Sequence, residues 1–103
     1  MTFAPMQQQV EEWISQHTSG YFEPLMMLAR LTEELGELSR AVSHKHGGKR
    51  PKPGEAPGDI SDELGDLLFV LICLANEQGI DLDQSWAGLL RKLYERDQDR
   101  WKG

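Results

Sequence analysis

The sequence is poor in cysteine, in long apolar runs and in positive charge, and each shortage excludes a class of protein. Its one cysteine, Cys73, cannot form a disulfide within the chain and lies in an apolar run, where we expect it to be buried. The longest unbroken apolar run, residues 67–75, has nine residues, far short of the ~20 of a membrane-spanning helix. Lys and Arg number 11 against 17 Asp and Glu, giving a formal charge of −6. Nucleic acids and anionic membranes would repel such a chain, so we expect neither as a partner.

The length of the chain predicts one domain. With 103 residues, 39% of them hydrophobic, we expect a single domain spanning residues 1–103. The N-terminal region has no basic segment followed by a long apolar core, so we expect no secretory signal and a cytoplasmic location. A domain of this size buries a smaller share of its surface than a large one does, and association with further copies would add buried area.

The spacing of apolar residues predicts helix over most of the chain. β-Branched residues are few, and no run alternates between apolar and polar residues as a half-buried strand would. We expect four helices, at residues 5–17, 24–43, 59–78 and 83–101. Asp59 and Asp83 are the expected N-caps of the last two. Residues 44–58 contain three prolines and four glycines, which predicts a loop. The predicted fold is therefore an all-α, antiparallel four-helix bundle.

Two of these helices have apolar faces that indicate how they pack. In the second, apolar residues three and four positions apart form one seam: Leu28, Leu31, Leu35, Leu38 and Val42. In the third, residues 67–75 are apolar all around the helix, which is typical of a helix buried on every side. A chain of four helices offers few neighbours, so we expect the third helix to pack on another subunit as well. The alternative is that it is the central helix of a monomer.

The second and third helices share a short internal repeat. Residues 33–38 read Glu-Glu-Leu-Gly-Glu-Leu, and residues 62–67 read Asp-Glu-Leu-Gly-Asp-Leu. In each copy the last two carboxylates are three residues apart, on one helix face, and both pairs have the same offset from their leucines. Antiparallel packing would therefore bring both pairs to one groove. Each mid-helix glycine costs about 1 kcal/mol relative to alanine, so we expect Gly36 and Gly65 to allow a close backbone approach or room for a ligand.

Four carboxylates in one groove would repel one another unless a cation joined them. Oxygen ligands without His or Cys suit hard cations such as Mg²⁺ or Mn²⁺, which predicts a metal site. The alternative is that the carboxylates are solvated surface groups. A di-iron site would need Glu-x-x-His, and none of the three histidines, His17, His44 and His46, follows a carboxylate by three residues.

The sequence resembles the MazG-like nucleoside triphosphate pyrophosphohydrolases, in particular their small single-domain branch. The resemblance rests on Glu33-Glu34-x-x-Glu37 followed, after 25 residues, by Glu63-x-x-Asp66, and on residues 21–24 and 92–101. It implies an all-α enzyme that works as a dimer or a dimer of dimers. The implied reaction converts a nucleoside triphosphate and water to a nucleoside monophosphate and pyrophosphate, with Mg²⁺ required. The implied role is the removal of non-standard or surplus nucleotides.

The resemblance also assigns roles to single residues. It implies that four carboxylates hold the metal: Glu34, Glu37, Glu63 and Asp66. Glu33 matches a position that would orient water or a ligand, and Lys92 and Arg96 match basic positions that would contact phosphates. Leu90 stands where the related pattern has Asn, which keeps open the alternative of a catalytically silent nucleotide-binding or protein-interaction module.

Two further groups of side chains have both a functional and a structural interpretation. Four positive charges lie close together in the predicted loop, at Lys45, Lys49, Arg50 and Lys52. They would form either a flap that closes over phosphates or a solvated loop. Among the aromatic residues, Tyr21 and Phe22 lie beside the first acidic helix and are the better candidates to stack on a nucleobase, whereas we expect most of the others to be core residues.

Overall fold

A computed structural model of the chain describes residues 2–48, 50–56 and 58–96. It contains four α-helices in these residues: α1 (Phe3–Ile14), α2 (Pro24–Lys45), α3 (Ile60–Glu77) and α4 (Leu82–Arg91). A short π-helical segment, η1 (Lys92–Arg96), continues α4. No strand occurs in the described part of the chain, which confirms the all-α class.

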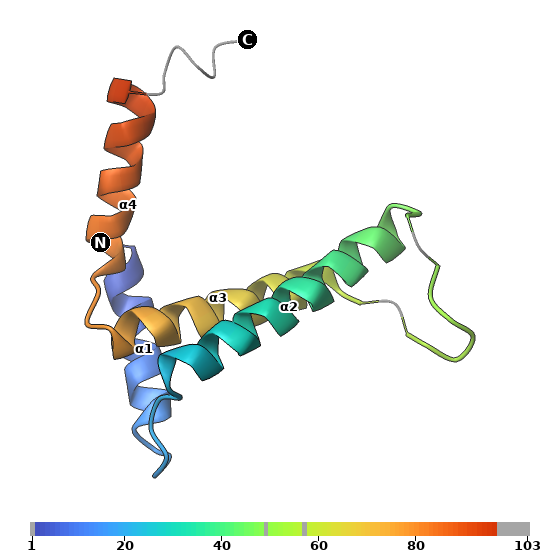
Figure 1. The fold of residues 1–103 in the computed structure, drawn as a ribbon, viewed down its shortest axis with the longest axis horizontal. Coiled ribbons are helices and arrows are strands. Elements are labelled where there is room, and N and C mark those ends of the chain that lie inside the picture. The colour runs from blue at the N-terminus through green and yellow to red at the C-terminus, as the bar shows by residue number, and fades with distance from the viewer. Residues whose placement is uncertain (1, 49, 57, 97–103) are drawn as a thin grey trace.

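The arrangement of the helices is dominated by one antiparallel pair. Helices α2 and α3 lie side by side, α1 crosses the end of this pair, and α4 runs away from it (Figure 1). The helix boundaries lie close to those expected from the sequence, except that the fourth helix changes to π-helix at residue 92. The part of that predicted helix after residue 96 lies outside the described residues. None of the described helices is both long and apolar enough to cross a membrane.

The hydrophobic core lies where α1, α2 and α3 meet. Its buried members are Val10, Met27, Ile72 and Cys73, and Met6, Ile14, Tyr21, Leu74 and Leu82 pack around them. The expected burial of Cys73 is confirmed. Burial also raises the pKa of its thiol, because a thiolate is poorly solvated among apolar groups.

The apolar seam predicted for α2 is only partly right: Leu31 and Leu38 are half-buried, but the other three members lie beside the buried positions. Met27 and Ala41 are buried, whereas Leu28, Leu35 and Val42 keep exposed fractions of 58%, 55% and 41%. The line of α2 that faces α3 therefore runs through Met27, Leu31, Glu34, Leu38 and Ala41, which follow one another by about one helical turn. The carboxylate of Glu34 lies on this inward line, with only 15% of its side chain exposed.

The apolar run of α3 is only partly covered by its own chain. Val70, Ile72, Cys73 and Ala75 are buried, but Leu68, Phe69 and Leu71 are 37–44% exposed. Helix α3 is therefore not the fully enclosed central helix of a monomer, because α4 turns away instead of covering it (Figure 1).

Both of the predicted N-caps are aspartates that accept backbone hydrogen bonds, but only one caps the helix expected. Asp59 caps α3 as predicted and accepts a bond of 3.1 Å from the Asp62 amide. The prediction for α4 is wrong: Asp81 is its N-cap and accepts from the Asp83 amide at 2.9 Å. Helix α4 begins at Leu82, whose side chain packs on the core.

Asp83 instead holds the start of α1. Its two carboxylate oxygens accept bonds from the amides of Phe3 (2.9 Å) and Ala4 (3.0 Å), and the residue is only 8% exposed. Thr2 makes no side-chain cap of its own, so Asp83 supplies the acceptors that the first turn lacks. Gln7 adds a second tie, because its amide group donates to Asn76 and Ile80 and accepts from the Leu82 amide.

We expect Asp83→Ala to lower the melting temperature, since it leaves the amides of Phe3 and Ala4 without their acceptors. Loss of a capping carboxylate costs about 0.5–2 kcal/mol, and 1 kcal/mol shifts the melting temperature of a domain of this size by roughly 4–8 °C. Thermal unfolding followed by circular dichroism measures the change. Glu23→Ala is the matched control, because Glu23 is an N-cap acid that accepts no capping hydrogen bond. Equal melting temperatures for the two variants would contradict the capping role of Asp83.

Candidate metal and nucleotide site

Three carboxylates meet where α2 and α3 pack together. One oxygen each of Glu34, Glu63 and Asp66 lies within 4.8 Å of the others. Glu34 and Glu63 are half-buried, and Asp66 is exposed. The antiparallel packing brings the two copies of the acidic repeat together, so three of the four predicted metal ligands lie in one cluster.

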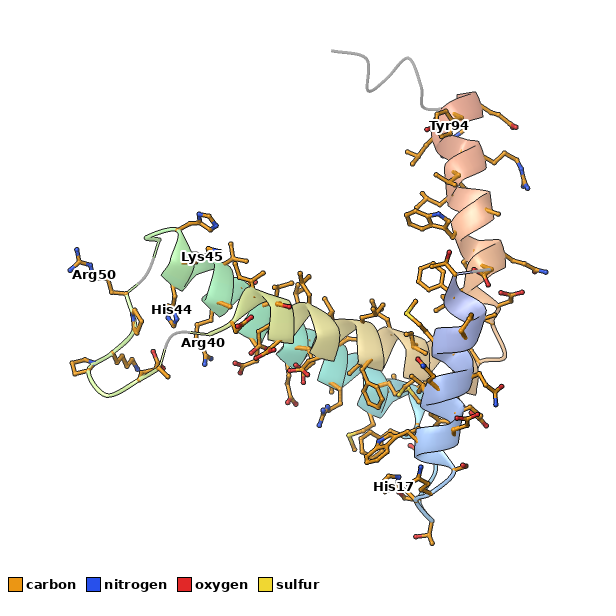
Figure 2. The ribbon with its side chains drawn as sticks, turned by 180° about the vertical axis from the view of Figure 1, so that it is seen from behind. His17, Arg40, His44, Lys45, Arg50 and Tyr94 are labelled. Atoms are coloured by element: carbon orange, nitrogen blue, oxygen red, sulfur yellow. The ribbon has the colours of Figure 1, made fainter. Side chains whose placement is uncertain are left out.

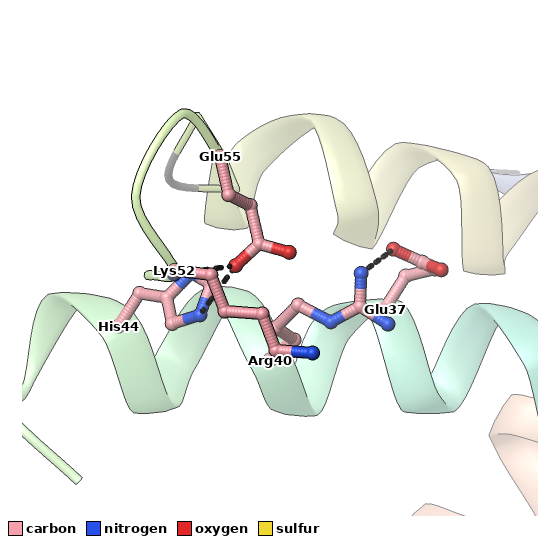
Figure 3. Close-up of polar contacts among 5 residues, drawn as sticks. All are labelled: Glu37, Arg40, His44, Lys52 and Glu55. Carbon is pink, nitrogen blue, oxygen red and sulfur yellow. Dashed lines mark hydrogen bonds and ion pairs between the residues drawn. The ribbon is translucent and has the colours of Figure 1, made fainter. Parts of the chain in front are cut away.

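Glu37, the fourth predicted ligand, lies beside this cluster but outside it. Its carboxylate is 3.4 Å from the guanidinium of Arg40, one turn further along α2 (Figure 3). The cluster has a second cation on its other side, where Arg30 lies 3.6 Å from Glu34. Arg40 follows Glu37 by three residues, and Arg30 precedes Glu34 by four. In both pairs the two side chains are therefore neighbours on the surface of α2.

The electrostatics of the cluster favour a bound cation. The pKa of Glu63 is raised above its ordinary value, first by desolvation and then by the negative charges of Asp66, Glu37 and Glu34. A divalent cation between these oxygens would remove the repulsion. The donor set, which is all carboxylate oxygen, fits a hard ion such as Mg²⁺ or Mn²⁺.

The two repeat glycines have open space where a side chain would stand. A Cβ built at Gly36 or Gly65 meets nothing within 4 Å in the described chain. Close approach of another backbone of this chain is therefore not the reason for either glycine. Room for a ligand or for a second copy remains the explanation. Gly65 also lines a shallow pocket with Trp13 and Phe69.

An aromatic pocket of about 280 Å³ lies next to the carboxylates. Its wall includes Trp13, Tyr21, Phe22, Arg30 and Phe69. Arg30 connects the two features, since its guanidinium also pairs with Glu34 of the cluster. The pocket thus offers apolar ring faces on one side and a cation near the carboxylates on the other, which suits a nucleobase and its sugar.

The aromatic candidates for base stacking differ in how firmly they are held. The Tyr21 hydroxyl donates to Glu11 and accepts from the Asn76 amide at 3.0 Å. Burial, together with the hydrogen bond to Glu11, raises the pKa of Tyr21 to about 12, so this hydroxyl stays protonated at neutral pH. Phe22 is 51% exposed and lines the pocket, whereas Trp86 on α4 packs against Phe3 on α1.

The remaining predicted site residues lie apart from the cluster. Glu33 is exposed on α2, directly before Glu34. Lys92 and Arg96 lie in η1, at the end of the helix that runs away from α2 and α3 (Figure 1). The structure does not bring these two cations to the cluster of Glu34, Glu63 and Asp66 in their own chain. Sequence reasoning did not single out Arg30, although its position four residues before Glu34 is the signal that could have identified it.

The fold and this site define a small all-α protein whose paired acidic helices form a cation site beside an aromatic pocket. The sequence profile of the MazG nucleotide pyrophosphohydrolase domain matches residues 22–101. The chain therefore belongs to the MazG nucleotide pyrophosphohydrolase family, and it is a hydrolase that acts on nucleotides.

Individual relatives agree with this assignment. The chain is 47% identical over 100 residues to YpjD of Bacillus subtilis, an uncharacterized protein, covering 97% of this chain and 90% of that one. It superposes with a TM-score of 0.80 on the Bacillus-conserved MazG protein, a nucleotide pyrophosphohydrolase, at 45% identity over 96% of both chains. A crystal structure of Bacillus subtilis YpjD, described as a candidate pyrophosphatase, gives a TM-score of 0.84 at 44% identity. That superposition covers 94% of this chain and 97% of the other.

The raised pKa of Glu63 predicts how the stability of the metal-free protein depends on pH. The folded chain holds the proton of the Glu63 carboxyl more tightly than the unfolded chain does, in which the pKa of this group is near 4.5. The free energy of unfolding should therefore fall as the pH rises from that value through the raised pKa. Glu63→Gln should remove this part of the fall and leave the metal-free protein no less stable at neutral pH. Melting temperatures measured in chelator across this range test it.

Glu12→Gln is the control for the same measurement, because Glu12 is an exposed acid on α1, away from the cluster. It should keep the pH dependence of the wild type. If Glu63→Gln and Glu12→Gln show the same pH dependence, Glu63 does not carry the repulsion inferred for the cluster.

Proposed function

We propose that the protein is a Mg²⁺-dependent nucleoside triphosphate pyrophosphohydrolase, with Mn²⁺ as a possible substitute. The observation that supports this most strongly is the cluster of Glu34, Glu63 and Asp66 between the paired helices of a MazG domain. When bound there, the cation would offset the carboxylate charge, bind phosphate oxygens and lower the pKa of a water molecule. We further propose that the enzyme removes non-standard or surplus nucleotides in the cytoplasm.

The reaction needs one bond formed and one broken. A water oxygen bonds to the α-phosphorus, and the bond from that phosphorus to the oxygen bridging to the β-phosphate breaks. The bridging oxygen leaves with its electron pair as part of pyrophosphate, and the water gives up a proton. In this proposal Glu34, Glu63 and Asp66, with Glu37 as a fourth ligand, hold the cation. Glu33, on the exposed side of α2, orients the water.

The aromatic pocket holds the nucleoside end of the substrate in this proposal. Tyr21 and Phe22 form part of its wall, and Arg30 lies between the pocket and the carboxylates. Lys92 and Arg96, which match basic positions of the family, would reach phosphates only from a second copy, since α4 runs away from the site of its own chain (Figure 1). Leu90, where the related pattern has Asn, favours a second candidate, a module that binds nucleotides without hydrolysing them.

Incubation with a panel of nucleoside triphosphates and Mg²⁺ tests the proposed reaction. We expect pyrophosphate and nucleoside monophosphate in equal amounts and no orthophosphate. Glu63→Gln and Asp66→Asn should each lower turnover by about a hundredfold or more, because each removes a charged oxygen ligand, while the helix content stays unchanged. Nucleotide binding without pyrophosphate release would instead support the non-catalytic module.

We also propose that the protein associates with copies of itself. Glu34 and Glu63 face inward between the two helices. Glu37 and Asp66 lie on one flank of the helix pair, and Leu35 and Leu64 lie on the opposite flank. The leucine flank is exposed and apolar. It consists of Leu28, Leu35, Val42, Leu64, Leu68 and Leu71, and we call it the apolar face. A second copy would cover this face, as the apolar run of α3 suggests.

Substitution on the apolar face tests this association. Leu35→Lys and Leu71→Lys should shift the protein towards monomer in light scattering, because each places a charge in the proposed interface. Val70 is unsuitable for this test, since it is buried within its own chain. Ala29→Lys is the control, because Ala29 is exposed on the side of α2 away from α3. A monomeric wild type at micromolar concentration would contradict self-association.

A further inference from the structure

The loop between α2 and α3 is fastened to α2 at two points. The Glu55 carboxylate lies 3.9 Å from Nε2 of His44, near the end of α2 (Figure 3). Further along the loop, Gly58 packs on Ala41 so closely that a Cβ at position 58 would lie 2.9 Å from the Ala41 Cβ. The described part of this loop therefore has a defined place on α2, and it is not a flap without contacts.

His44 is an unusual residue to place under a surface loop. Its side chain is 2% exposed, and its Nδ1 atom is buried with no hydrogen-bond partner in the described chain. Burying a polar nitrogen without a partner costs free energy, so such an atom needs a reason other than packing. The other ring nitrogen, Nε2, is the one that faces the Glu55 carboxylate, so the buried imidazole lies where it can position the loop.

Glu55 in turn fixes the position of Lys52. One carboxylate oxygen of Glu55 accepts a bond of 3.2 Å from the Lys52 amide, and the Glu55 amide donates to the Lys52 carbonyl at 2.9 Å. Gly54, with a φ of +83°, makes this tight turn possible. The turn directs the Lys52 side chain along α2 towards Arg40 (Figure 3), whereas Arg50 points away from the helices (Figure 2).

The cations near the end of α2 have few anionic partners, although the chain has an excess of acid. No ion pair is found for Lys45, Arg50 or Lys52 within residues 2–48, 50–56 and 58–96. Arg40 pairs with Glu37, but both side chains are about half exposed, and such pairs are weak. The Arg40 guanidinium can therefore also bind a phosphate, with which it forms stronger paired hydrogen bonds.

The aromatic pocket, the carboxylates and the cations follow one another along α2 in the same order as the base, the α-phosphate and the terminal phosphates of a nucleoside triphosphate. Arg30 and the aromatic pocket come first, the carboxylates from Glu34 onward come next, and Arg40 follows, with the loop beyond it. The helix rises by about 1.5 Å per residue, so Arg40 lies about 9 Å beyond Glu34. That spacing leaves room for two phosphates between the carboxylates and the loop cations.

We propose that Arg40 and Lys52 bind the two terminal phosphates of the substrate, which leave as pyrophosphate, and that His44 is a positioning residue that holds Lys52 there through Glu55. This inference rests on the proposed function and adds a direction to it. The nucleotide lies along α2, with its base at the aromatic pocket and its leaving group at the loop.

Binding of pyrophosphate in the presence of Mg²⁺, measured by calorimetry on the full chain, tests the assignment. Arg40→Gln and Lys52→Gln should each weaken binding by about tenfold, the loss expected for one hydrogen bond to a charged group. Arg50→Gln, which removes one positive charge from the same loop, should change it by less than about twofold, because an exposed charge at a distance is screened.

The role of His44 is tested with the same probe and with kinetics. His44→Ala should weaken pyrophosphate binding as much as Lys52→Gln does, and the two changes together should weaken it little further, because both act through one side chain. In His44→Ala, the KM for a nucleotide that the enzyme hydrolyses should rise while kcat changes little. His44→Gln, which keeps a polar side chain near Glu55, should restore part of the loss. A merely structural role would lower the melting temperature without this selective effect on pyrophosphate.

Unchanged pyrophosphate affinity in Arg40→Gln and Lys52→Gln would overturn the inference, as would a loss confined to Lys92→Gln. So would a wild-type chain that binds no pyrophosphate. A wild type that binds pyrophosphate through Arg40 and Lys52 but releases none from any nucleotide would contradict the proposed hydrolysis and support the binding assignment. The two proposals can therefore fail separately.

Discussion

The antiparallel contact between α2 and α3 places a carboxylate on the inward line of each helix, and the rest of the site depends on this placement. Glu34 occupies a position on α2 that faces α3, between Met27 and Ala41. Glu63 is brought opposite, and desolvation is the largest cause of its raised pKa. An apolar residue at either position would improve packing, since buried charge opposes folding unless it is compensated. The helix pair is thus built around negative charges that a bound cation would compensate.

The part of the molecule that stabilises the fold is separate from the part that carries this charge. The core lies at the crossing of α1 with the helix pair, where Ile72 and Cys73 are buried. Polar ties from Asp83 and Gln7 fix α1 to the turn between α3 and α4. The carboxylates of the cluster come from the middle of α2 and the first two turns of α3, and none of them belongs to this core. Repulsion in the cluster is therefore opposed by packing elsewhere, and the site can remain open to substrate.

The position of each charged group along α2 gives the site a direction. Arg30 lies on the pocket side of Glu34 and Arg40 on the loop side of Glu37, each as a neighbour on the same helix. A nucleoside triphosphate has the corresponding asymmetry, with an apolar ring at one end and concentrated negative charge at the other. The match between these two orders supports one orientation of the substrate on the chain. In that orientation the departing pyrophosphate would lie near Arg40, whose pair with Glu37 is half exposed, and near Lys52 of the loop.

Local sequence determined the helices and the residues that carry the chemistry. Hydrophobic spacing, prolines and the glycine-rich loop are properties of neighbouring residues, so α2 and α3 begin and end close to their predicted positions. The acidic repeat identified Glu34, Glu63 and Asp66 for the same reason, because three-residue spacing sets a shared helix face before any tertiary contact forms.

Only the tertiary structure decided which flank of each helix is buried and which distant groups meet. The inward line of α2 keeps Leu31 and Leu38 of the predicted seam but passes through Glu34 instead of Leu35, because a helix with apolar residues on two flanks can pack by either, and α3 selected one. Asp83 caps α1 instead of α4, and His44 meets Glu55 across a loop. Partners so far apart in sequence have no periodic signal, since their contact depends on the path of the whole chain.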